Sequence, residues 1–165
     1  MEIAIRDARP EDASVILDLI KELATYEKAA DQVVATVDSI KSGLFGDGAH
    51  IHARICEVDG QPAGFALYFF SFSTWQGRKG LYLEDLYVTP RFRGAGAGKQ
   101  LLHDLAKIAV NTGCGRFEWS VLDWNEPAIR FYESVGAKPQ SEWVRYRLTG
   151  DALQAFADDR EVKAD

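Results

Sequence analysis

The sequence has no long apolar run, few cysteines and no excess of basic side chains. No stretch approaches the roughly 18 consecutive apolar residues of a membrane-spanning helix, and residues 1–10 are charged rather than signal-like, so neither membrane insertion nor export is expected. Nineteen Lys and Arg against 25 Asp and Glu give a net charge of −6, which argues against a nucleic-acid surface and suits a cationic substrate. We therefore expect a cytoplasmic protein with no membrane and no nucleic-acid partner.

The two cysteines and three histidines lack the spacing of a metal site. Cys56 and Cys114 stand far apart in the sequence, and a buried thiol is expected for each. His50 and His52 alternate along a predicted strand, whereas His103 lies on a predicted helix, which does not match a set of zinc ligands. No metal is predicted. No Ser-His-Asp or Cys-His arrangement is suggested either, so the usual basis for a covalent intermediate is missing.

The glycine-rich segment of residues 93–98 is the most informative part of the chain. It lies between an apolar run, residues 81–88, and an amphipathic helical pattern. Alternate glycines let the backbone approach an anion closely, and the following helix adds the positive end of its dipole. The P-loop pattern fails because of Arg93 and Gln100, and the dinucleotide fingerprint fails at Lys99. From these residues alone, a pyrophosphate-binding loop and a plain strand-to-helix turn both stay open.

Hydrophobic periodicity alternates between the strand and helix repeats along the chain. We predict strands over residues 2–6, 50–58, 63–72, 81–88, 117–122, from about 137 and over 142–148. We predict helices over about 15–28, 36–44, from the glycine-rich segment to 113, over about 125–135 and from 149. Asp59 and Gly60 predict a tight hairpin turn. This order predicts a mixed α/β fold in one domain over residues 1–165, with residues 158–165 as a frayed tail.

Several segments together resemble those of a known enzyme family. They are residues 20–24, 26–27, 83–88, 93–98, 123–132 and 136–137. Over nearly its whole length the sequence resembles the GCN5-related N-acetyltransferase (GNAT) family, in its diamine acetyltransferase (spermidine/spermine N1-acetyltransferase-like) branch. The resemblance implies the GNAT fold, with a mixed central sheet of about six to seven strands flanked by about four helices. It also implies acetyl-CoA as co-substrate and a homodimer.

The resemblance implies catalytic roles for Glu84 and Tyr132. A primary amine, with a pKa near ~10.4, is protonated at neutral pH and must lose a proton before it can attack. Glu84 is implied to accept that proton directly or through water; the alternative is that it pairs with a nearby base or the ammonium. Tyr132, with a phenol pKa near ~10, is implied to protonate the departing sulfur; the alternative is a core aromatic side chain.

Cofactor contacts are implied for three sets of residues. The strand residues Leu86, Tyr87 and Val88 are implied to hold the pantetheine arm through backbone groups, as a further strand would be held. Asn125 is implied to lie near the coenzyme, while its position also predicts a helix N-cap, and the two roles are compatible. Lys99 either pairs with a phosphate or is a solvated lysine. The loop residues are Arg93, Gly94, Ala95, Gly96, Ala97, Gly98 and Lys99.

The acceptor pocket is implied to be lined by carboxylates and aromatic rings, which suit a substrate with ammonium groups. Acidic residues on a solvated face would look the same in sequence. Ser73 stands where the spermidine/spermine type has an acidic residue, which argues against long polyamines. Residues 73–78 and 121–125 are closer to the type associated with thialysine and related short amino compounds. The implied lining residues are Tyr26, Glu27, Trp75, Glu84, Asp85 and Glu142.

The resulting prediction is direct acetyl transfer, in a ternary complex, to a primary amine of a small di- or polyamine or thialysine-like compound. Two other functions stay open at this point. A non-catalytic acyl-CoA sensor is disfavoured because both Tyr132 and Glu84 are present. A protein lysine or N-terminal acetyltransferase would be disfavoured by a narrow acid-lined pocket and favoured by an open groove.

Overall fold

The computed structural model describes residues 1–161 and divides the chain into two units. Residues 1–122 form the first unit, which contains the sheet, and the second unit begins at Asp123. A single domain over the whole chain therefore stays a prediction. Among residues 1–161, no helix has both the length and the apolar character needed to cross a membrane.

The first unit is built on a sheet whose strands lie side by side in chain order. Each of the first four strands pairs antiparallel with the next, and the fifth pairs parallel with the fourth. The parallel pair needs a crossover connection, which a helix provides. The strands are β1 (Ile3–Asp7), β2 (Ile51–Val58), β3 (Gln61–Ser73), β4 (Arg78–Val88) and β5 (Arg116–Trp119).

The turn between β2 and β3 is the predicted tight hairpin. Asp59 and Gly60 have φ values of 50° and 79°, the positive values that a two-residue hairpin turn favours. The Asp59 carboxylate also accepts a hydrogen bond from the Glu2 backbone N–H at 2.8 Å. The hairpin prediction is confirmed, and β1 is attached next to it.

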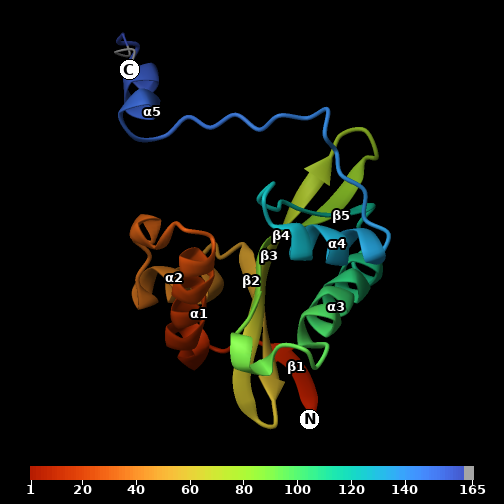
Figure 1. Ribbon diagram of the computed structural model, residues 1–165. Helices are drawn as coiled ribbons and strands as arrows, with labels where there is room; N and C mark the ends of the chain where they lie inside the picture. The colour runs from red at the N-terminus through yellow and green to blue at the C-terminus, as the bar shows by residue number, and fades with distance from the viewer. Residues whose placement is uncertain (162–165) are drawn as a thin grey trace. The chain divides into compact units, whose positions relative to one another are not determined.

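Helices cover both faces of this sheet, as Figure 1 shows. On one face α1 (Ala13–Tyr26) and α2 (Val37–Phe45) contribute Ile16, Leu19 and Leu44 to a buried cluster with strand residues. On the other face lies α3 (Ala97–Asn111), the crossover helix. Arg54 of β2 points to that second face, where its Nε donates to Asp104 of α3 at 2.8 Å.

The start of α1 is fixed by a buried carboxylate. Asp12 accepts hydrogen bonds from the Arg6 guanidinium at 2.7 and 3.0 Å and from the Arg9 backbone N–H at 2.7 Å. The hydrogen bonds from Arg6 lower the pKa of Asp12 more than burial raises it. At the other end of α1, Glu22 accepts a hydrogen bond from the Tyr87 hydroxyl of β4 at 3.2 Å, so this end of the helix lies against β4.

The second unit contains α4 (Glu126–Ser134) and α5 (Gly150–Ala157). Asn125 caps α4 as predicted, since its Oδ1 accepts from the Ala128 N–H at 3.4 Å. The two strands predicted after residue 137 are wrong, because residues 137–149 form no strand. Val144 and Tyr146 are 74% and 93% exposed there. Their residue types favour a strand, but a strand forms only where a partner backbone is available.

The predicted mixed α/β class is confirmed with different counts. Residues 1–161 contain five strands rather than six or seven, and five α-helices rather than about four. β5 also ends at Trp119 instead of residue 122. Cys56 is buried as predicted, whereas Cys114 is partly exposed because it follows the end of α3. Of the predicted frayed tail, residues 162–165 lie outside the described residues.

Candidate functional site

Strand β4 contains a β-bulge at Glu84. Leu83 pairs with Tyr68 and Asp85 pairs with Leu67, so Glu84 is an extra residue with no partner on β3. A bulge shifts the alternation of side chains by one residue. Leu83 therefore faces α3, while Asp85 lies with Leu67 on the face covered by α1. Glu84 is exposed at the bulge, whereas the next carboxylate, that of Asp85, is partly buried.

The acidic group formed by Glu27, Glu84 and Asp85 has perturbed electrostatics. Burial raises the pKa of Asp85 to about 6, and the negative charges of Glu84 and Glu27 contribute to the rise. Burial also raises the pKa of Glu27, which directly follows α1. Burial disfavours the ionised form of a carboxyl group, and negative charges nearby add to this effect at Asp85. A bound cation would relieve this repulsion, and such perturbed carboxyls are typical of functional sites.

The other predicted acceptor residues lie in three places. Tyr26 is the last residue of α1, next to the acidic group. Trp75 is 80% exposed in the turn between β3 and β4. Asp85 is seven residues along β4 from Arg78, where this turn ends, so Trp75 lies about 20 Å from the acidic group. Glu142 belongs to the segment of the second unit without strands. The first unit thus brings Tyr26, Glu27, Glu84 and Asp85 together, but not Trp75.

The second half of β4 has an open edge. β5 pairs with β4 only from Gly80 to Leu83, so residues 84–88 have no β5 partner. The Thr89 N–H donates to the Ala63 carbonyl at 2.8 Å, which makes Gly64 and Val88 a pair without mutual hydrogen bonds. The backbone groups of Val88, and by alternation those of Leu86, therefore point to the open edge.

Tyr87 differs from its two neighbours in this respect. Its backbone groups point to β3, and a Cβ on Gly64 would collide with the Tyr87 carbonyl oxygen. Of the three predicted backbone contacts to a ligand at the edge, this geometry favours those of Leu86 and Val88. The contact of Tyr87 stays a prediction that the geometry does not favour.

The glycine-rich loop has the geometry of an anion-binding turn. Gly94 and Gly96 both have a φ of 87°, and a Cβ on either would meet no atom within 4 Å, so the backbone is accessible. Gly96 is the N-cap of α3 and supplies no side-chain acceptor for the first-turn N–H groups, which have no partner inside the helix. Ala97 is buried and anchors α3, whereas Lys99 is exposed. The loop therefore fits a diphosphate at a helix N-terminus.

Arg93 connects the glycine-rich loop to the end of α1. Its Nε donates to the Val88 carbonyl at 2.9 Å. Its guanidinium carbon lies 5.4 Å from the centroid of the Tyr87 ring and 5.9 Å from that of Tyr26. The Tyr87 hydroxyl in turn donates to Glu22 Oε1 at 3.2 Å. The sequence prediction assigned Arg93 to the cofactor and Tyr26 to the acceptor, and it gave Glu22 no role; only the structure brings the three together.

Tyr132 and Asn125 belong to the second unit. Tyr132 lies in the last turns of α4, where its ring is 5.6 Å from that of Phe131. Asn125 is the N-cap described above. Their predicted roles toward the coenzyme stay predictions.

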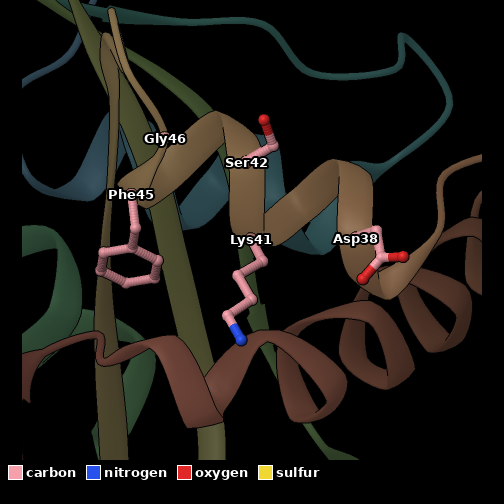
Figure 2. Close-up of a pocket in the computed structure, with 5 residues that line it drawn as sticks. All are labelled: Asp38, Lys41, Ser42, Phe45 and Gly46. Carbon is pink, nitrogen blue, oxygen red and sulfur yellow. The ribbon is translucent and has the colours of Figure 1, made fainter.

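A separate hollow of about 330 Å³ lies on α2. Figure 2 shows its lining side chains, with Lys41 and Phe45 on one side of the helix and Ser42 on another. All of its lining residues come from α2 and its C-cap, and none is a predicted site residue. This hollow is a surface feature of one helix, separate from the acidic group and the glycine-rich loop. Within residues 1–161, no three His, Cys, Asp or Glu side chains form a group that could hold a metal ion.

Comparison with known proteins gives consistent matches. The model of the acetyltransferase (GNAT) family matches residues 16–137. The chain is 38% identical to the thialysine N-epsilon-acetyltransferase of Bos taurus, over 94% of this chain and 97% of that one. It is 33% identical to the L-ornithine N5-acetyltransferase of Arabidopsis thaliana, over 92% and 86%. An integron cassette protein from the V. cholerae mobile metagenome has a TM-score of 0.80 at 27% identity, over 95% and 98%.

Proposed function

Since the chain belongs to the GNAT family of acetyltransferases, we propose that it transfers an acetyl group from acetyl-CoA to a primary amine of a small thialysine-like or diamine compound. Family membership makes the protein an acetyl-transfer enzyme. The observation that supports a cationic acceptor is the acidic group, in which burial and like charge raise the pKa of Asp85 to about 6. A substrate ammonium group would be attracted to this position.

In this proposal the acyl donor binds at the open edge of β4 and at the glycine-rich loop. Acetyl-CoA supplies the thioester from which the acetyl group is transferred. Leu86 and Val88 hold its pantetheine arm through their backbone groups at the edge, in the manner of an added strand. The N–H groups of the loop and of the first turn of α3 bind the diphosphate. Asn125 and Lys99 contribute further contacts in this proposal.

Proton transfer is assigned to Glu84 and Tyr132. The bond that forms joins the amine nitrogen to the acetyl carbon, and the bond that breaks joins this carbon to the sulfur. Glu84 takes the proton that the ammonium group loses before attack, and the Tyr132 hydroxyl gives a proton to the sulfur as the carbon–sulfur bond breaks. The second proton, which the nitrogen loses as the amide forms, passes to the Tyr132 phenolate or to water. Asp85 and Glu27 hold a charged group of the acceptor. Exchange of protons with water returns both proton-transfer side chains to their starting states. No acyl-enzyme forms in this proposal, because the amine nitrogen attacks the thioester carbon directly.

The substrate class is narrowed by the named relatives. They act on thialysine in mammals and on L-ornithine in a plant, which are short amino acids with a terminal amine. We propose an acceptor of this kind, with long polyamines as poorer substrates.

An amine panel tests this proposal. Purified protein with acetyl-CoA is given thialysine, lysine, ornithine, putrescine, spermidine, spermine and a lysine-containing peptide, and thiol release is measured. We expect turnover with thialysine or ornithine, and a fall of about 100-fold or more in kcat for Glu84→Gln. Preference for spermine would overturn the substrate class, and preference for the peptide would make the protein a protein acetyltransferase. Binding of acetyl-CoA without any turnover would make it a sensor.

A further inference from the structure

The side chain of Arg93 contacts β4 and the end of α1. Its Nε donates to the Val88 carbonyl at 2.9 Å, and its guanidinium lies over the rings of Tyr87 and Tyr26. The Arg93 N–H is also used, because it donates to the Pro90 carbonyl at 3.2 Å. An arginine in a phosphate-binding loop would be expected to direct its planar donor group to the anion. Here the flat group instead packs against the acceptor side of the candidate site.

The two rings that contact Arg93 differ in burial and in their position in the fold. Tyr87 is buried in the strand, and its hydroxyl donates to Glu22 at 3.2 Å. Tyr26 is 41% exposed and is the last residue of α1, a position where helices fray. The contact with Arg93 is therefore a restraint at the exposed end of α1.

Tyr26 is directly followed by Glu27, whose charge acts on Asp85. The orientation of this helix end consequently affects the position of the Tyr26 ring and the position of the Glu27 charge in the acidic group. Any side chain that restrains Tyr26 also restrains the acceptor side.

We propose that Arg93 is a positioning residue for the acceptor amine. Its guanidinium connects the end of β4 to the Tyr26 ring, and through Tyr26 it orients the place where the acceptor binds. The inference deepens the proposed function and rests on it. Arg93 binds no phosphate in this assignment; it holds the Val88 carbonyl, which leaves the Val88 N–H for the cofactor.

The substitution Arg93→Lys separates positioning from phosphate binding. Lysine keeps the positive charge, but it has no planar fork that can donate to Val88 and lie over two rings at once. We expect the KM for the acceptor amine to rise about tenfold, with the dissociation constant of acetyl-CoA, measured by calorimetry, changed less than twofold. A role in phosphate binding would give the opposite split, with weaker acetyl-CoA binding and an unchanged KM for the amine.

Arg91→Lys is the matched control. Arg91 lies two residues earlier, and its guanidinium also contacts a ring, that of Phe92 at 4.5 Å, and the Gln61 side chain at 3.0 Å. Neither of these two contacts involves α1. We expect this variant to keep the wild-type KM for both substrates.

A double-mutant cycle tests whether Arg93 acts through Tyr26. Tyr26→Leu keeps an apolar side chain and removes the ring face. If the proposal holds, Arg93→Lys has less than a twofold further effect on the amine KM in the Tyr26→Leu background, because the contact is already lost. Fully multiplicative effects would overturn the positioning role. If the wild-type protein is active and the two effects multiply, only the positioning role is wrong and the proposed function stands. If the wild-type protein is inactive with every amine, both the positioning role and the proposed function are wrong.

Discussion

Strand β4 and residues 142–148 are both rich in aromatic and aliphatic side chains that favour strands, but only β4 is a strand. β4 pairs with β3 along its length and with β5 along its first half. Residues 142–148 form no strand, and Val144 is 74% exposed. Sequence pattern thus predicts the local conformation that a segment favours, but not whether a partner backbone is present. The structure describes the contacts of the site residues on β4. The proposed roles of residues in the second unit need kinetic tests.

The largest effect is expected in the second unit, for Tyr132→Phe. Loss of the hydroxyl removes the proposed proton donor to sulfur, so kcat should fall about 100-fold while acetyl-CoA affinity stays within twofold. Steady-state kinetics and calorimetry measure the two quantities. Tyr146→Phe is the control, because Tyr146 lies in the same unit and is 93% exposed. An unchanged kcat for Tyr132→Phe would show that Tyr132 is not the proton donor. The proposed proton transfer would then involve β4 but not the second unit.

The next effect is expected in the glycine-rich loop, for Gly96→Ala. Gly96 and Gly113 flank α3 with φ values of 87° and 81°, and a Cβ on either meets nothing within 4 Å. Either Gly→Ala change should therefore cost the fold a similar 1 to 2 kcal/mol of backbone strain. Only Gly96→Ala should also weaken acetyl-CoA binding, about tenfold in calorimetry, because its methyl group lies at the anion-binding face. Equal acetyl-CoA affinities for the Gly96→Ala and Gly113→Ala variants would contradict the assigned loop function.

A smaller effect is expected at the bulge, for Asp85→Asn. Because the folded-state pKa of Asp85 is raised to about 6 from its ordinary value of 3.8, ionised Asp85 destabilises the folded chain relative to the unfolded chain. The resulting penalty is absent below about pH 4 and complete above about pH 6. Asp85→Asn should therefore raise the free energy of unfolding by about 1 kcal/mol at pH 7.5, after allowance for partial exposure, and by nothing at pH 4.

Urea denaturation at both pH values checks this expectation. Asp18→Asn on the exposed face of α1 serves as the control and should show no such difference between the two pH values. The same Asp85→Asn change should weaken binding of the acceptor amine. Stability that is unchanged at pH 7.5 would mean that the acidic group is well solvated.

The sequence predicted those parts of the site that depend on local geometry. The turn at Gly94 and Gly96 and the cap at Asn125 are local features, and the structure has them as expected, whereas Gly98 lies in the first turn of α3. The bulge at Glu84 was not predicted, because it depends on the register with Leu67 and Tyr68, residues from another strand. The contact of Arg93 with Tyr26 was not predicted either, since it joins a loop to the end of a helix 67 positions earlier. Pairing and register depend on distant residues, and a single sequence does not specify them.

The smallest effect is expected for Val144→Ser, as a change in the affinity between two copies of the chain. We propose that the protein is a homodimer, as its family resemblance implies, and that the second copy covers residues 142–148. Val144 is 74% exposed in the single chain, so the change should leave the stability of an isolated chain within about 0.5 kcal/mol. It should raise the dimer dissociation constant about fivefold, since the loss of buried apolar area costs about 1 kcal/mol in total for the two copies of Val144. Sedimentation velocity over a concentration series measures this constant, with Val34→Ser as the control because Val34 is 88% exposed in the first unit. A wild-type protein that sediments as a monomer at every concentration would show that a second copy does not supply the missing strand partner.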